Sequence, residues 1–209
     1  MSWIDLLGRA LGKEGKATHI REYGNQVLEE IAQRTKDVKE EDKPRALLLI
    51  NYNESGKSTS GKKQFARFQL EASGARHVAA DVEETFIQLD MEQIYSWNPD
   101  VIYITTFSQM MPVDLYNNTA VEGDDWSVVK AVQDKRVHKF PLGIFHWYPP
   151  SADAPLALLW LAKNNHPDLF ADVDLNQRVK EYYKEMYEIE LTDEEVESIF
   201  ASTRDAANQ

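Results

Sequence analysis

The chain has 209 residues, 43% of them hydrophobic, which is enough apolar content for one sizeable core with a small appendage. Its 35 Asp and Glu outnumber its 23 Lys and Arg, and no basic stripe interrupts this excess, so the charge argues against nucleic-acid binding. The absence of cysteine excludes disulfides, thiolate metal sites and cysteine nucleophiles.

The N-terminal segment, residues 1–15, lacks the pattern of a signal peptide. Asp5 and Arg9 interrupt its apolar residues, and no basic region precedes them. No later run reaches the roughly 18 to 20 apolar residues of a membrane span. The chain as written is therefore expected to stay in the cytoplasm, without membrane insertion.

A long, highly charged helix is predicted over residues 16–42. Its apolar residues Tyr23, Val27 and Ile31 recur every four positions, which is typical of a helix that lies on a domain. Pro44 marks the end of this segment, because the residue before a proline is biased away from helix.

Alternating strands and helices are predicted for the rest of the chain, residues 43–209. The predicted strands are 46–50, 77–80, 101–105 and 137–140. The predicted helices are 62–74, 90–97, 125–134, 155–165, 175–187 and 192–200. This alternation predicts an α/β fold with a mainly parallel sheet, in which ligands bind beyond the carboxyl ends of the strands. Function is therefore expected in the loops at 51–61, 106–124 and 141–153.

The loop after the first strand resembles the end of a phosphate-binding loop. Gly56, Lys57 and Ser58 match the last part of the pattern G-x-x-x-x-G-K-[ST], but Asn51 stands where the first glycine belongs. Gly61 also interrupts the helix that should begin at the lysine. A nucleotide-binding domain that uses this loop is therefore kept as an alternative to the flexible polar loop that we favour.

The five histidines are scattered along the chain, and no two of them form an i, i+4 pair, so no metal site is predicted. His146 differs from the others because it lies in the segment FHWYPP beside Trp147 and Tyr148. These aromatic residues could face a ligand or cap a buried hinge. No Ser-His-Asp or paired-carboxylate arrangement is apparent, so we predict neither catalytic residues nor a cofactor.

Two stretches of the sequence carry a family resemblance. LDMEQIYSWNPDVIYIT combines a short helix, an N-P-D turn and an apolar strand. WSVVKAVQDKRVHKFPLGIFHWYPPSADAPLALLWLAKNNHPDLF adds a W-x-x-x-K-A-V helix, an R-V strand, an aromatic-proline loop and a helix ending in H-P-D-L-F. In this order the motifs resemble those of the siderophore-, haem- and cobalamin-type (class III) periplasmic substrate-binding proteins of ABC importers.

The resemblance implies two α/β lobes joined by one long helix, with the ligand held between them. Residues 1–15 would then be a remnant leading into the connecting helix at 16–42, and residues 43–209 a Rossmann-like, three-layer C-terminal lobe. The N-terminal lobe and the export signal are expected to lie outside this chain, through truncation, splitting or engineering. A complete member of the family is extracytoplasmic (periplasmic or on the cell surface) and delivers its ligand to an ABC permease.

The resemblance further implies binding rather than catalysis, with a chelated metal such as an iron-siderophore, haem or corrinoid as ligand. Aromatic faces would pack on the chelate, and Lys57 and His146 would contact its carboxylate or catecholate oxygens. An interaction-only domain is a further alternative. Apolar residues near the N-terminus without an evident partner predict either a homodimer or a disordered N-terminus. The predicted ligand-binding residues are Tyr52, Lys57, Phe107, Gln109, His146, Trp147 and Tyr148.

Overall fold

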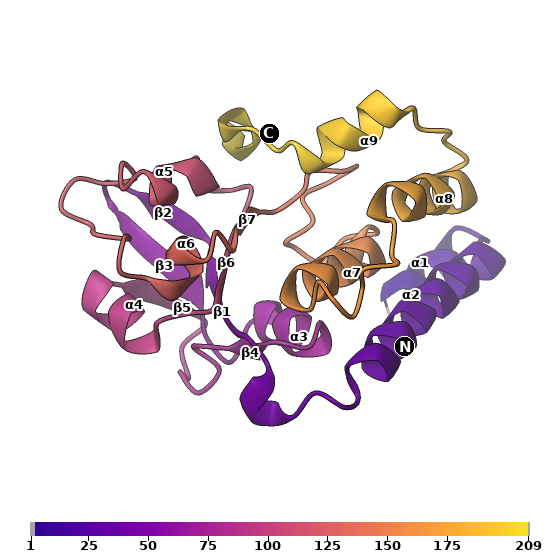
Figure 1. Ribbon diagram of the computed structural model, residues 1–209. Helices are drawn as coiled ribbons and strands as arrows, with labels where there is room; N and C mark the ends of the chain where they lie inside the picture. Colours follow the sequence, from indigo (N-terminus) through magenta and orange to yellow (C-terminus); the bar gives the residue numbers. More distant parts are fainter. Residues whose placement is uncertain (1–2, 209) are drawn as a thin grey trace.

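The computed structural model describes residues 3–208, and helices cover both faces of a parallel sheet (Figure 1). The strands are β1 (Arg45–Leu49), β2 (Asn51–Asn53), β3 (Gly56–Ser60), β4 (Arg76–His77), β5 (Phe86–Leu89), β6 (Val101–Ile104) and β7 (Val137–Lys139). The α-helices are α1 (Trp3–Ala10), α2 (Glu14–Thr35), α3 (Phe65–Ala72), α4 (Met91–Trp97), α5 (Pro112–Tyr116), α6 (Lys130–Gln133), α7 (Ala154–Asn165), α8 (Leu175–Tyr187) and α9 (Asp193–Phe200). Two 3-10 helices are η1 (Glu40–Asp42) and η2 (Arg204–Asn208). The predicted three-layer α/β fold is confirmed.

Four parallel strands form the central sheet, in the order β4-β1-β6-β7. Because successive side chains of a strand point to opposite faces, Leu48 of β1 joins a core beneath α3, α7 and α8. Its neighbours Leu47 and Leu49 join a second core beneath α4, α5 and α6. Burial on both faces explains why the two central strands, β1 and β6, are continuous apolar runs rather than alternating patterns.

The strand β7 lies at one edge of this sheet, and a tyrosine protects its outer side. Tyr116 Oη, from α5, donates to the backbone C=O of Val137 and accepts from its N–H, both at 3.1 Å. Unpaired strand edges can pair with other chains. The hydroxyl group occupies the backbone positions that such a strand would use.

Residues 51–61 form a β-hairpin rather than the predicted loop. β2 and β3 pair antiparallel, with Tyr52 opposite Lys57, and β3 pairs with β5 on its other side. Gly56, Lys57 and Ser58 therefore lie in an extended strand, and no helix begins at the lysine. The phosphate-loop alternative is wrong, because a phosphate loop needs free backbone N–H groups just before a helix.

The long N-terminal helix α2 is shorter than predicted and follows a helix that was not predicted. It ends at Thr35, because the residues after it, 36–42, are mostly exposed and would bury no apolar face. Val27 and Ile31 are buried beside residues of α7, so the predicted packing of α2 on the domain is confirmed. The added helix α1 packs on α2. None of the described helices is long and apolar enough to cross a membrane.

The last two helices, α8 and α9, lie where they were predicted. Thr192 and Glu195 form the predicted capping box at the start of α9. The helix predicted over 125–134 is reduced to the four residues of α6. The reason is local, since Asp125 Oδ1 accepts hydrogen bonds from the N–H and the hydroxyl of Ser127 and so holds a turn.

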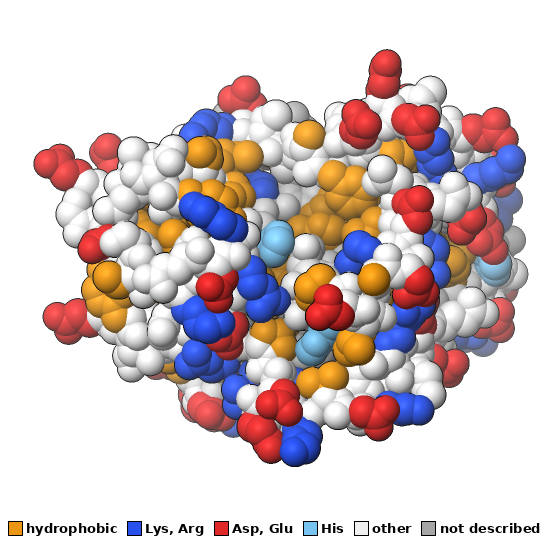
Figure 2. All heavy atoms as spheres, viewed as in Figure 1, with side chains coloured by type: hydrophobic (Ala, Val, Ile, Leu, Met, Phe, Trp, Pro, Cys, Tyr) orange, Lys and Arg blue, Asp and Glu red, His pale blue; other side chains and the backbone are white. Residues whose placement is uncertain are grey.

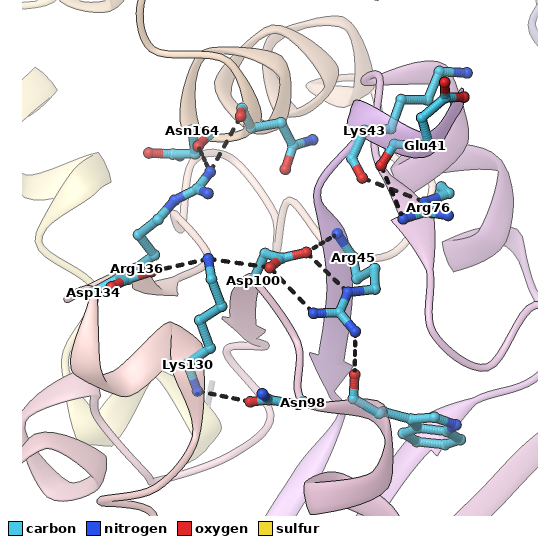
Figure 3. Close-up of polar contacts among 12 residues, drawn as sticks. Glu41, Lys43, Arg45, Arg76, Asn98, Asp100, Lys130, Asp134, Arg136 and Asn164 are labelled. Carbon is cyan, nitrogen blue, oxygen red and sulfur yellow. Dashed lines mark hydrogen bonds and ion pairs between the residues drawn. The ribbon is translucent and has the colours of Figure 1, made fainter. Parts of the chain in front are cut away.

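The amino ends of the parallel strands meet in a network of ion pairs and hydrogen bonds (Figure 3). Asp100, just before β6, accepts hydrogen bonds from the backbone and guanidinium nitrogens of Arg45 at 2.8–3.3 Å and pairs with Lys130 at 3.2 Å. Burial alone would raise the pKa of Asp100, but these donors lower it to about 2. The charged side chains at the amino ends of the strands are therefore paired with one another.

Candidate functional site

The loops after β6 and β7 present a surface that we call the carboxyl-end face, formed by Phe107, Gln109, Ile144, Phe145 and His146. Phe107, Phe145 and Ile144 are 38%, 50% and 57% exposed, and Gln109 is also exposed. Large apolar side chains gathered beyond the ends of parallel strands are typical of a binding surface. The sequence identified three of these five residues.

A hollow of about 590 Å³ opens beside the carboxyl-end face. Its lining includes Ile144, Phe145 and His146 from the loop after β7, and Ser198 and Ser202 from α9 and the turn that follows it. This volume lies within the range of small-molecule sites, which is roughly 300 to 1,000 Å³.

His146 lies between two aromatic rings of the carboxyl-end face. Its ring centroid is 4.8 Å from that of Phe107 and 4.9 Å from that of Phe145. Its Nδ1 is 2.6 Å from Thr106 Oγ1, which fixes the orientation of the imidazole. Burial lowers the pKa of His146, so the ring is neutral at neutral pH. The hydroxyl engages Nδ1, and Nε2 forms no hydrogen bond among residues 3–208, although only 5% of His146 is exposed.

Tyr52 and Lys57, two of the predicted ligand residues, converge on a carboxylate instead. Tyr52 Oη and Lys57 Nζ both donate to Asp124 Oδ2 at 2.7 Å, and Trp126 Nε1 donates to Tyr52 Oη at 2.8 Å. Tyr52 is buried, and only 11% of the Lys57 side chain is exposed. The cluster fastens the β2–β3 hairpin to the loop before α6, and it leaves these two side chains little surface for a ligand.

Trp147 and Tyr148 point into the core. Trp147 is fully buried and its Nε1 donates to Asp153 Oδ2 at 3.1 Å. The ring of Tyr148 packs on Phe65 at a centroid distance of 4.9 Å, and its buried hydroxyl has no partner among residues 3–208. Of the three neighbouring aromatic residues, His146 alone lines the hollow. For the other two, the structure favours the buried alternative that the sequence left open.

Asp153 anchors the loop after β7 to α8. Its buried carboxylate accepts hydrogen bonds from Trp147 Nε1 and Tyr183 Oη at 3.1 Å and from Tyr187 Oη at 2.8 Å. The backbone N–H of Ile144 donates to it at 3.2 Å. Since the loop carries three residues of the carboxyl-end face, this carboxylate sets their position.

Lys139 and Gly143 shape the two loops of the face. Lys139 Nζ donates to the carbonyl oxygens of Ser108 and Met110, the latter at 3.0 Å, and burial lowers its pKa to about 8. At Gly143 a Cβ atom would overlap the side chain of Asp153, so the loop can approach that carboxylate only with glycine here.

Sequence reasoning missed Ile144, Phe145 and Asp153. The first two adjoin His146 in the aromatic-proline loop, so the argument that selected His146 could have included them. The sequence around Asp153 does not indicate its anchoring role, because two of its partners, Tyr183 and Tyr187, lie 30 and 34 residues later in the chain. Among residues 3–208, no three His, Cys, Asp or Glu side chains are grouped as a metal site would require.

Three known proteins are among those that this chain resembles. The molybdate-binding protein MolA of Haemophilus influenzae is 32% identical over 130 residues, which are 62% of this chain and 36% of MolA. The structure of a periplasmic solute-binding protein from Veillonella parvula superposes with a TM-score of 0.84 and 30% identity, and it covers 99% of this chain and 60% of that one. Helicobacter pylori CeuE with Ni(II) bound gives a TM-score of 0.74 and 29% identity over 94% of this chain and 59% of that one.

The matched region thus spans about a third of MolA's length and about three fifths of the two solved chains. Residues 1–141, two thirds of this chain, also match the periplasmic binding protein family as a whole. The α/β layers agree with that match. The chain belongs to the periplasmic binding protein family.

Proposed function

We propose that this chain supplies one lobe of the substrate-binding component of an ABC importer, and that it binds its ligand without transforming it. The observation that carries the proposal is the carboxyl-end face, where Phe107, Phe145 and His146 gather at the ends of β6 and β7. In the proposed protein α2 is the connecting helix, the location is extracytoplasmic, and an ABC permease is the partner.

The ligand that fits this face best is a metal held in an organic chelate. Phe107 and Phe145 offer apolar surface to a planar or aromatic chelate, while neutral His146 and Gln109 offer polar contacts. A bare oxyanion needs several N–H or cationic donors, and the face has few. Arg204, which donates to the carbonyl oxygen of Gln109, is already bound to Asp114 through two hydrogen bonds of 2.6 Å. The relatives support a metal-containing ligand, since one is named for molybdate and another holds Ni(II).

The expected affinity is low if a second lobe normally covers the ligand. A micromolar binding protein has about −8 kcal/mol to distribute over its contacts. If one lobe supplies about half of this free energy, the remaining −4 kcal/mol or so corresponds to millimolar binding. Calorimetry with a ferric hydroxamate, haem, cobalamin, nickel-histidine and molybdate would test both the class of ligand and the affinity.

A pair of matched variants makes the test specific. Phe145→Ala removes an aromatic ring from the carboxyl-end face, whereas Phe86→Ala removes one of similar exposure, 56% against 50%, from β5. We expect only Phe145→Ala to weaken binding of the chelate. Equal affinities for the two variants would remove the face from the site, and micromolar binding by the parent chain would show that it carries a complete site.

A further inference from the structure

We propose that a hollow beside the outer edge of β7 is a second binding site, and that it takes a small organic anion with an aromatic or other apolar body. Figure 2 shows hydrophobic side chains gathered in a hollow between the sheet and the C-terminal helices. We call it the β7-edge hollow; its volume is about 420 Å³. Its lining includes Arg136, His138, Trp160, Lys163, Leu175 and Phe200.

The floor of the β7-edge hollow is apolar but contains polar groups without partners. Trp160, Leu175 and Phe200 supply the apolar surface. Within residues 3–208, neither the indole N–H of Trp160 nor a ring nitrogen of His138 forms a hydrogen bond, and these atoms face the open hollow rather than the closed core. Burial and the charge of Arg136 lower the pKa of His138 to about 4, so its imidazole is neutral and has one N–H to donate. A ligand with acceptor oxygens would satisfy these groups.

The charge at the rim of the hollow is positive. Arg136 donates to the carbonyl oxygens of Asn164 and Asn165 at 3.0 and 3.1 Å (the first is labelled in Figure 3). Lys163 donates to two carbonyl oxygens as well, both at 2.8 Å. In the described part of the chain neither cation forms an ion pair with a carboxylate, although Asp172, whose pKa is lowered chiefly by a hydrogen-bonded arginine, lies near enough to Lys163 for that cation to contribute. Positive charge beside an apolar floor favours an anion with an apolar body.

The edge of β7 rules out one other occupant, an extended peptide added as a further strand. Such a peptide needs the outward N–H and C=O of Val137, and the hydroxyl of Tyr116 already holds both. A small molecule that lies on Trp160 and Phe200 needs neither group. The contacts therefore favour a small ligand over strand addition.

The test uses the complete 209-residue chain with 2-naphthoate as the anionic probe and 2-naphthamide as its neutral counterpart. Both are titrated into ¹⁵N-labelled protein and followed through the indole N–H signals. We expect 2-naphthoate to shift the Trp160 signal saturably and to bind about fivefold more tightly than the amide, as expected for partly solvated ion pairs. Equal binding of the two probes, or no saturable shift at Trp160, would overturn the proposal.

Two variants locate the site. Lys163→Gln should weaken 2-naphthoate about fivefold, whereas Lys62→Gln, which removes an exposed cation paired with Glu83, should leave the affinity unchanged. Because Lys163 also holds backbone carbonyls, a second variant, Asn176→Trp, fills the hollow from its exposed rim and should abolish binding. Binding that survives Asn176→Trp places the probe elsewhere and contradicts the proposal.

Discussion

The two ends of the parallel sheet differ in the side chains that they present and in whether those side chains have partners within the fold. At the amino ends of the strands, Asp100 pairs with both Arg45 and Lys130, so these charged groups have their partners within the fold. At the carboxyl ends, Phe107 and Phe145 remain 38% and 50% exposed. Exposed aromatic rings contribute little to the stability of the chain itself. The difference indicates that the amino end maintains the fold and that the carboxyl end is available for binding.

The largest expected effect on the free energy of unfolding is that of replacing Asp153, whose carboxylate anchors the loop that carries three residues of the carboxyl-end face. Asp153→Ala removes an acceptor from four donors and leaves buried hydroxyl and indole groups unpaired, so the free energy of unfolding should fall by about 3 kcal/mol or more. Urea unfolding measures it. Asp193→Ala is the control, because its 88% exposed side chain pairs only with Lys180 and should cost below about 1 kcal/mol. Similar losses for both variants would show that the carboxylate does not anchor the loop.

The next effect concerns the cluster of Lys57, Tyr52 and Asp124. Lys57→Ala should lower the free energy of unfolding by about 2 to 3 kcal/mol, because Asp124 is left with its charge partly buried. Lys62→Ala, which breaks an exposed pair, should cost less than about 1 kcal/mol. ATP binding with and without magnesium is a second readout. Magnesium-dependent binding that Lys57→Ala abolishes would restore the nucleotide-binding alternative.

A smaller effect on stability is expected at Asp100, which lies at the amino ends of the parallel strands. The pKa of Asp100 in the folded protein is about 2, below its ordinary value near 3.9, so its stabilising contribution is present above that value and is lost as the pH falls toward 2. Asp100→Asn should therefore cost about 1 to 2 kcal/mol at pH 7, with allowance for partly solvated partners, and almost nothing at pH 2. Unfolding of both proteins between pH 2 and 7 measures this difference. A cost that does not change with pH would mean that the carboxylate charge is not what matters.

The smallest effect on stability is expected at α1, remote from both ends of the sheet. Leu7 and Leu11 are 53% and 69% exposed, so replacing both by serine should change the free energy of unfolding by less than about 0.5 kcal/mol. If this surface forms the predicted homodimer, the double variant should nevertheless shift sedimentation toward the monomer, while Phe68→Ser, at a 57% exposed position of α3, should not. A parent chain that stays monomeric at high concentration would contradict the dimer.

The centre of the parallel sheet could be predicted because β1 and β6 are buried on both faces and their sequences are therefore apolar runs. The hairpin β2–β3 could not, since Ser58, Thr59 and Ser60 are buried through pairing with β5 rather than through apolar side chains. A local signal was present at its turn, where Asn53 Oδ1 accepts from the N–H of Ser55. That pattern of Asn, Ser and Gly is as typical of a hairpin as of a loop.

The candidate site was only partly predictable for a related reason. The segments at 106–124 and 141–153 do follow strand ends, whereas 51–61 is a hairpin, and the direction of each side chain depends on partners far away in the sequence. Trp147 turns into the core because Asp153 and Phe200 receive it, whereas His146, itself only 5% exposed, lines the hollow because Thr106 holds its Nδ1. Two adjacent buried residues thus have different surroundings, and no local rule separates them.

The hydroxyl of Tyr116 at the edge of β7 has a consequence for how the chain folds. It belongs to α5, which precedes β7 in the chain, so synthesis completes α5 before the strand that it covers. A nascent chain can therefore shield β7 as soon as the strand docks on β6. An intermediate in which α5 is detached would instead expose a flat, hydrogen-bonding edge to neighbouring molecules. The order of the elements along the chain thus protects against fibrillar misassembly at the stage when the protein is most vulnerable to it.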